Sequence, residues 1–105
     1  MNEKKYRVCL SVPLGERMGT LTIQASNGKV NGWLEVMKHR NAISGKISSD
    51  GHIELSGELR TLISTVHYTA SGIISGRRIL LDMKTASGAY YPVFGEEYNI
   101  DEEIL

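Results

Sequence analysis

The sequence predicts an all-β protein, a small barrel of eight antiparallel strands joined as an up-and-down meander. Glycine returns every 12 or 13 residues, at Gly19, Gly32, Gly45 and Gly57, among alternating aliphatic residues. This spacing is typical of one strand plus one tight turn. An even number of such strands lets the last pair with the first, which removes both edges of the sheet. The alternative is a twisted open sheet that dimerises through its free edges.

The turn signals place the strands in order along the chain. Four-residue links are expected at 14–17, 38–41 and 61–64, with tighter turns between them. The resulting strands are expected at residues 5–13, 18–26, 29–37, 42–48, 52–60, 65–74, 77–86 and 89–95. They make up a single domain, residues 1–95. Residues 96–105 are expected to form an acidic tail or a helical turn, because Asn99 is suited to cap a short helix.

The turns also predict how the strands are aligned. Asn27 and Gly28 favour a type I′ turn, which places Leu21 opposite Leu34 on an apolar face. Residues 49–51 favour a three-residue loop that matches apolar residues across the next hairpin, Ile47 with Ile53 and Gly45 with Leu55. Two-residue turns at 75–76 and 87–88 predict the remaining pairs: Gly72 with Ile79, Ala70 with Leu81, Tyr68 with Met83, Thr85 with Tyr90, and Leu81 with Phe94.

One face of every predicted strand is apolar and forms the expected barrel interior. Its members are Tyr6, Val8, Leu10, Val12, Leu21, Ile23, Val30, Leu34, Val36, Ile43, Ile47, Ile53, Leu55, Leu59, Val66, Tyr68, Ile79, Leu81 and Met83. Glycines on this face favour a sharply coiled sheet. The alternative is that they leave an apolar cavity for a small ligand, beside Gly32, Gly45, Gly57 and Tyr68.

Composition limits where and how the protein acts. The single cysteine, Cys9, excludes an intrachain disulfide, and its neighbours give no reason for a reactive thiol. No apolar segment has the length of a signal peptide or a membrane span, so we expect a cytoplasmic protein without membrane contact. The net charge is zero, and aromatic residues are only 7% of the chain, which argues against nucleic-acid binding.

No catalytic motif is present, and the three histidines are scattered, so neither an enzyme, a metal site nor a cofactor is expected. The one arrangement that resembles acid–base machinery is an outward row of Glu58, His67 and Lys84. A carboxylate beside an imidazole raises its pKa and orients it. Rows of mixed charge are more often ordinary surface pairing, so a hydrolase-like activity here is a remote alternative.

Outward apolar residues indicate a functional surface more strongly than the charged residues do. Two clusters are expected on the outside of the barrel, Met18, Trp33 and Met37 on the second and third strands, and Ile73, Leu80 and Val93 near the last three. Scattered surface hydrophobes are normal, but two clusters on one small barrel favour an interface. Trp33, with Lys46 next to it and Lys38 and Arg40 beyond, is the best basic patch, but a lone tryptophan with a cation over its ring is a common structural pair.

The architecture is similar to that of calycin-type and avidin-type meander barrels, without a shared motif, and a fold alone implies no function. The leading hypothesis is a non-catalytic module that acts through protein association, as a homo-oligomer or an accessory subunit. The alternative is a carrier of a small apolar ligand in the barrel interior.

Overall fold

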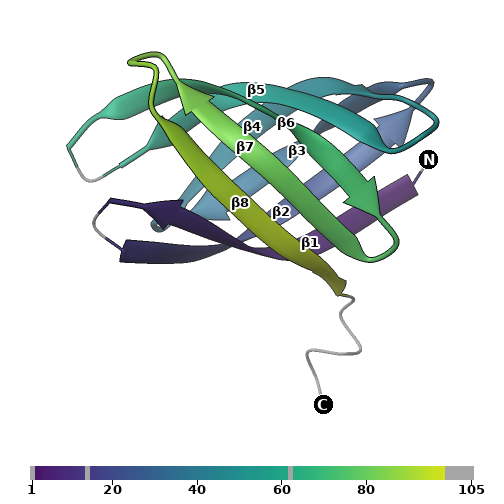
Figure 1. Ribbon diagram of the computed structural model, residues 1–105, viewed down its shortest axis with the longest axis horizontal. Helices are drawn as coiled ribbons and strands as arrows, with labels where there is room; N and C mark the ends of the chain where they lie inside the picture. The colour runs from purple at the N-terminus through teal and green to yellow at the C-terminus, as the bar shows by residue number, and fades with distance from the viewer. Residues whose placement is uncertain (1, 14, 62, 99–105) are drawn as a thin grey trace.

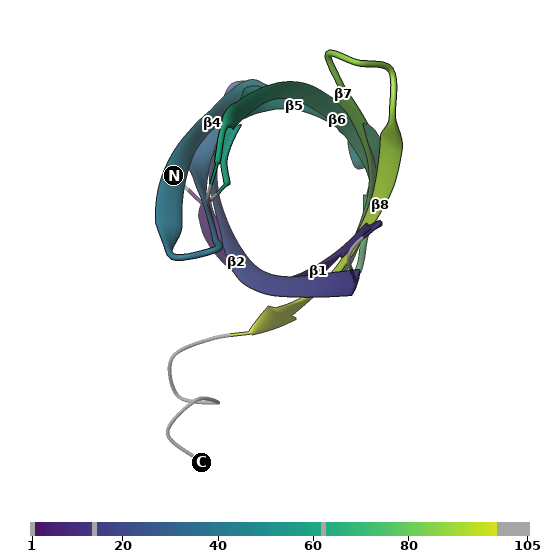
Figure 2. The ribbon, with the colours of Figure 1, turned by 90° about the vertical axis from the view of Figure 1, so that its left-hand side faces the viewer.

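The computed structural model describes residues 2–13, 15–61 and 63–98, and these form a closed antiparallel barrel (Figures 1 and 2). Each strand pairs with its neighbours in sequence, and β1 pairs with β8, so the all-β meander barrel expected from the sequence is confirmed. The strands are β1 (Asn2–Val12), β2 (Gly15–Ser26), β3 (Lys29–Val36), β4 (His39–Ile47), β5 (His52–Arg60), β6 (Thr65–Ser75), β7 (Arg78–Thr85) and β8 (Tyr90–Tyr98).

The links between the strands are divided between the two ends of the barrel. The β1–β2, β3–β4, β5–β6 and β7–β8 links lie at one end, which faces the viewer in Figure 2. The start of β1, the end of β8 and the other three links lie at the opposite end (Figure 1). Because β8 continues through Tyr98, Glu96 and Glu97 belong to the strand rather than to the expected tail. The helical turn expected after Asn99 lies outside the described residues.

The expected alignment is confirmed for the β2–β3 and β4–β5 hairpins. Asn27 and Gly28 have φ angles of 54° and 79°, as a type I′ turn requires, and Leu21 lies opposite Leu34. The loop at 49–51 has three residues, which sets Ile47 opposite Ile53 and Gly45 opposite Leu55. These turns were recognisable because their glycines occupy positions that need a positive φ.

The expected alignment of β6 with β7 is wrong by two residues. Tyr68 lies opposite Thr85 rather than Met83, Ala70 lies opposite Met83, and Gly72 lies opposite Leu81 rather than Ile79. The turn is centred one residue later than expected, on Gly76 and Arg77, and only Gly76 has a positive φ, 59°. Glycine at the first central position is typical of a type II′ turn. A shift of two residues leaves each side chain on its expected face.

The expected alignment of β7 with β8 is wrong by one residue. This error has a larger consequence than the two-residue error between β6 and β7. Tyr90 lies opposite Lys84 rather than Thr85, and Leu81 lies opposite Val93 rather than Phe94. The link is a three-residue loop like that at 49–51. The Thr85 N–H donates to the carbonyl of Ala89, and Gly88 has a φ of 91°. An odd shift exchanges the two faces of a strand, so Val93 points inward and Phe94 outward.

Two expected links are also shorter than four residues. β2 already begins at Gly15, which places Arg17 inside a strand, opposite Leu10. A two-residue turn, Met37 and Lys38, joins β3 to β4. Both of its residues have positive φ although neither is glycine, so no sequence signal identified the turn.

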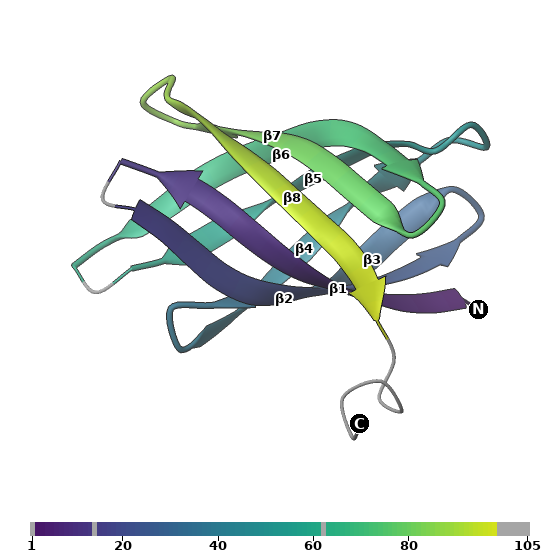
Figure 3. The same ribbon diagram turned by 60° about the horizontal axis from the view of Figure 1, so that its bottom comes forward.

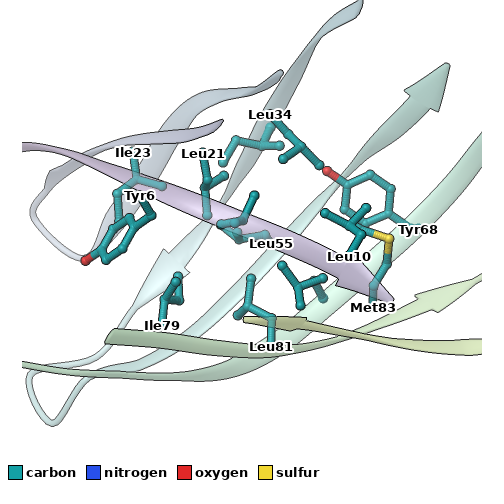
Figure 4. Close-up of a cluster of buried hydrophobic side chains, with 14 of the residues drawn as sticks. Tyr6, Leu10, Leu21, Ile23, Leu34, Leu55, Tyr68, Ile79, Leu81 and Met83 are labelled. Atoms are coloured by element: carbon teal, nitrogen blue, oxygen red, sulfur yellow. The ribbon is translucent and has the colours of Figure 1, made fainter. Parts of the chain in front are cut away.

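Inward side chains from all eight strands fill the middle of the barrel. Figure 4 shows part of this core, with Tyr6 at one end of the labelled cluster and Tyr68 at the other. The expected interior residues are buried, apart from Val12, Ile47 and Val66, which are half-buried, and Ala70 and Val93 are buried with them. Burying this apolar face is the main term that stabilises the barrel.

Candidate functional site

A continuous row of apolar side chains crosses the outside of five adjacent strands. Ile73 of β6 lies opposite Leu80 of β7, and Leu80 lies opposite Phe94 of β8. Phe94 lies opposite Cys9 of β1, which in turn lies opposite Met18 of β2. Figure 3 shows these strands side by side. Residues directly opposite on one face have Cβ atoms about 5 Å apart, so the side chains form one strip, which we call the apolar row.

The apolar row is open to solvent. The exposed fraction is 37% for Ile73, 51% for Leu80, 45% for Phe94 and 69% for Met18, and Cys9 is half-buried. The sequence predicted the outward positions of Met18, Ile73 and Leu80 but placed them in two clusters. The prediction for Val93 is wrong, because only 3% of Val93 is exposed. Phe94 was missed for the same reason, the one-residue error in the β7–β8 loop, and it joins the two ends of the row.

Trp33 and Met37 do not belong to the apolar row. Trp33 lies on the outside of β3, and the guanidinium of Arg40 sits 4.4 Å from the centre of its ring. Arg40, one of the three cations expected near Trp33, therefore lies over the indole, whereas Lys46 lies opposite Lys29 and Glu54. Met37 is half-buried and packs against the core, so its expected outward position is wrong.

The two flanks of the apolar row differ in charge. On one side, two positions along their strands from Leu80 and Met18, lie the exposed carboxylates of Asp82 and Glu16. On the other side, Arg78 of β7 forms an ion pair with Glu96 of β8 at 3.8 Å, and Arg7 of β1 lies opposite Glu96. One flank is thus acidic, and the other carries two arginines and one carboxylate.

The thiol in the middle of the row is not activated. Cys9 donates a hydrogen bond from Sγ to the Glu16 carboxylate at 3.1 Å. This bond holds the proton on sulfur and, with the nearby negative charge, raises the pKa of the Cys9 thiol. Cys9 therefore contributes to the row as a small, weakly polar side chain.

The interior glycines do not create the cavity considered from the sequence. A Cβ atom added to Gly32 or Gly45 would lie 1.8 Å from a carbonyl oxygen of the neighbouring strand, and the same holds for Gly72. These glycines allow close approach of backbones in a sharply coiled sheet. A Cβ on Gly57 would lie 3.1 Å from the hydroxyl of Tyr68, because the Tyr68 ring covers this glycine from the opposite strand.

A pocket of about 360 Å³ opens instead at the barrel end that faces the viewer in Figure 2. Its inner end is formed by Tyr68 and Met83, which lie next to Leu10 in Figure 4. The volume falls within the range of about 300–1,000 Å³ that is usual for small-molecule sites. Its remaining apolar lining comes from six strand and turn residues: Val12, Met37, Leu59, Val66, Tyr91 and Pro13.

Among the residues that the structure describes, Arg17 is the one charged residue that lines this pocket. It shares the inward face of β2 with Gly19 and Leu21, because alternate residues of a strand point to the same side. The alternation of inward and outward residues along β2 could have identified Arg17 as inward-facing, but the sequence prediction placed Arg17 in a loop. Of the candidate cavity residues, only Tyr68 lines the pocket; Gly32, Gly45 and Gly57 do not.

The expected row of Glu58, His67 and Lys84 is not assembled as a triple. Glu58 and His67 do form a pair, with Oε1 and Nδ1 3.4 Å apart. Lys84 instead lies opposite Thr69, and its Nζ is 5.6 Å from the centre of the Tyr90 ring. The two-residue shift between β6 and β7 separates it from His67. Within residues 2–13, 15–61 and 63–98, no group of three or more His, Cys, Asp or Glu side chains could hold a metal ion.

Compared with known proteins, the chain matches no family model, no curated protein and no solved structure. Within its described part, no helix is long and apolar enough to cross a membrane.

Proposed function

We propose that the protein is a non-catalytic module that acts by self-association, with two copies binding through the apolar row. The observation that carries this proposal is the continuity of the row across β6, β7, β8, β1 and β2. Burying a large apolar side chain fully is worth about 1.5–3 kcal/mol, and Leu80, Phe94 and Met18 are each about half exposed or more. A contiguous exposed strip of this kind is typical of an interaction surface.

The charges beside the row favour a second copy of the chain as the partner. A two-fold axis that runs along the row places the acidic flank of one copy, with Asp82 and Glu16, against the flank of the other copy that carries Arg78 and Arg7. Two-fold interfaces are self-complementary, and opposite charges at the rim select this orientation. A two-fold axis that lies in the plane of the interface but runs across the row would instead bring the acidic flanks of the two copies together.

The test is sedimentation equilibrium with native mass spectrometry over a range of protein concentrations. We expect a dimer for the wild-type chain. Leu80→Glu and Phe94→Glu should be largely monomeric, because each places a charge within the apolar row, which the dimer would bury. Asp82→Arg is expected to weaken the dimer as well, because it brings like charges together across the two-fold axis.

Ser56→Glu is the matched control. It adds the same charge to an exposed position on β5, outside the apolar row, and should leave the mass unchanged. A wild-type protein that stays monomeric at high concentration would refute the proposal, as would a dimer that survives both Leu80→Glu and Phe94→Glu.

A further inference from the structure

In the described part of the chain, the pocket at the barrel end combines an apolar lining with one positive charge. Tyr68 and Met83 are buried at its inner end, and its other apolar lining includes buried Leu59 and half-buried Met37 and Tyr91. Arg17 is half-buried on the inward face of β2. An arginine placed against an apolar lining loses hydration, so it is usually paired with a carboxylate or another acceptor.

Arg17 has no carboxylate partner in the described part of the chain. Its Nη1 donates to the backbone carbonyl of Glu16 at 3.1 Å, while the Glu16 carboxylate accepts the hydrogen bond of Cys9 on the outer face. The ion pairs formed among the described residues do not include Arg17. A planar guanidinium has five N–H donors, so most of its hydrogen-bonding capacity remains for another acceptor.

The threonine and serine hydroxyl groups around the pocket are used within their own loops. Thr61 accepts hydrogen bonds from the backbone of Ile63 and Ser64, and the Thr85 hydroxyl lies 2.9 Å from that of Ser87. Burial raises the pKa of Tyr68 to about 12, so this phenol is uncharged at neutral pH and does not repel an anion. Among the described residues that line the pocket, Arg17 is therefore the charged group that can attract an anion.

We propose that this pocket binds an aliphatic monocarboxylate, with the alkyl chain among the apolar residues and the carboxylate on the guanidinium of Arg17. One cation at the mouth matches one anionic head group, and guanidinium and carboxylate can form two parallel hydrogen bonds. The packed core beyond Tyr68 and Met83 closes the inner end, so the chain enters from the open end of the barrel and the head group stays near the rim. This site is separate from the apolar row.

Methionine methyl NMR gives a direct test, because the methionines report on different places. Met37 and Met83 line the pocket, whereas Met18 lies in the apolar row. We expect decanoate, below its micelle concentration, to shift the methyl signals of Met37 and Met83 and to leave that of Met18 unchanged. Decanol has the same chain without the charge, and should bind about tenfold or more weakly, as should decyltrimethylammonium.

Variants of Arg17 separate recognition of the anion from burial of the chain. Arg17→Met should weaken decanoate binding by about tenfold to a hundredfold and leave decanol binding almost unchanged. Arg17→Lys keeps the charge but loses the planar pair of donors, so it should bind decanoate more weakly than the wild type and more tightly than Arg17→Met. Arg40→Met removes an arginine from the outer surface and serves as the control, with no change expected. Leu80→Glu should bind decanoate normally, since it alters only the apolar row.

Three results would overturn the proposal: equal affinities of the wild-type protein for decanoate and decanol, no shift of the Met37 and Met83 signals, or a Met18 shift as large as theirs. The last result would mean that the alkyl chain adsorbs on the apolar row. The comparison of decanoate with decanol uses the unmodified protein, so it remains decisive even where a variant of Arg17 fails to fold.

Discussion

Tyr6 is a completely buried residue whose hydroxyl has no hydrogen-bond partner in the described part of the chain. It lies on the inward face of β1, opposite Leu21 of β2 and Glu97 of β8. Burial, together with the negative charge of Glu97, raises the pKa of Tyr6 to about 12. A buried hydroxyl without a partner costs free energy, so the ring contributes to the core while its hydroxyl does not.

Replacing Tyr6 by Phe tests this at two pH values. At pH 8 we expect the free energy of unfolding to stay the same or to rise by about 1 kcal/mol, because the variant removes a buried polar group without a partner. At high pH, the direction in which stability changes follows from the pKa values of the phenol in the folded and unfolded states. The unfolded phenol ionises near 10 and the folded one near 12, so wild-type stability falls as the pH rises from about 10 to 12.

Tyr6→Phe should make this alkaline decline shallower by about 1–2 kcal/mol, and Tyr68→Phe, whose pKa is also raised to about 12, should do the same. Urea unfolding at several pH values measures both effects. A loss of stability well above 1 kcal/mol in Tyr6→Phe at pH 8 would contradict the description of Tyr6 as a hydroxyl without a partner.

At the scale of elements, the β3–β4 turn stands out because it lacks the residues that its geometry favours. Met37 and Lys38 have φ angles of 52° and 65°, the region that glycine and asparagine adopt most readily. The β2–β3 turn has similar angles with Asn27 and Gly28 in these positions. The strained turn holds Met37 at the rim of the pocket, where its side chain packs against the core.

Lys38→Gly should therefore stabilise the protein by about 1 kcal/mol, because it relieves the left-handed conformation at a position whose side chain is exposed. Lys29→Gly is the control within the same strand pair. It introduces glycine into a regular strand, and should destabilise by up to about 1 kcal/mol. Chemical unfolding of both variants measures the difference. A loss of stability in Lys38→Gly equal to that in Lys29→Gly would show that the turn is not strained.

At the scale of the whole molecule, the pairing of β1 with β8 turns a meander into a closed barrel. Six residue pairs from Lys5–Tyr98 to Leu10–Val93 join the two strands. Gly95 permits their close approach, since a Cβ there would lie 2.7 Å from a methyl group of Val8. An open sheet would leave the N–H and C=O groups along one side of β1 and of β8 without strand partners.

Hydrogen exchange distinguishes the two forms. In the closed barrel, the amides that pair β1 with β8 should be protected to about the same degree as those that pair β6 with β7, because neither pair contains a sheet edge. The Leu80→Glu variant, which we expect to be monomeric, should show the same protection of the β1 and β8 amides. Rapid exchange of the β1 and β8 amides in that variant would mean that an open sheet had been closed by pairing with a second copy.

The number of strands, their order and most of the residues that face the interior could be predicted from the sequence, although Val93 and Arg17 were not among them. Each depends on local signals, such as a side-chain period of two and the glycines that mark most turns. Thus the type I′ turn at Asn27 and Gly28 and the loop at 49–51 were identified correctly. The turn at Met37 and Lys38 was not, because it contains no residue that favours a turn.

The apolar row and the barrel-end pocket were decided only by the tertiary structure. Both combine residues from strands far apart in the chain, so they depend on how all the turns together align the strands. A loop longer by one residue at 86–88 moved Phe94 outward and Val93 inward, and it is Phe94 that joins Leu80 to Cys9 and Met18. Alternation along a strand establishes which residues share a face, but only closure of the barrel establishes which of them are neighbours.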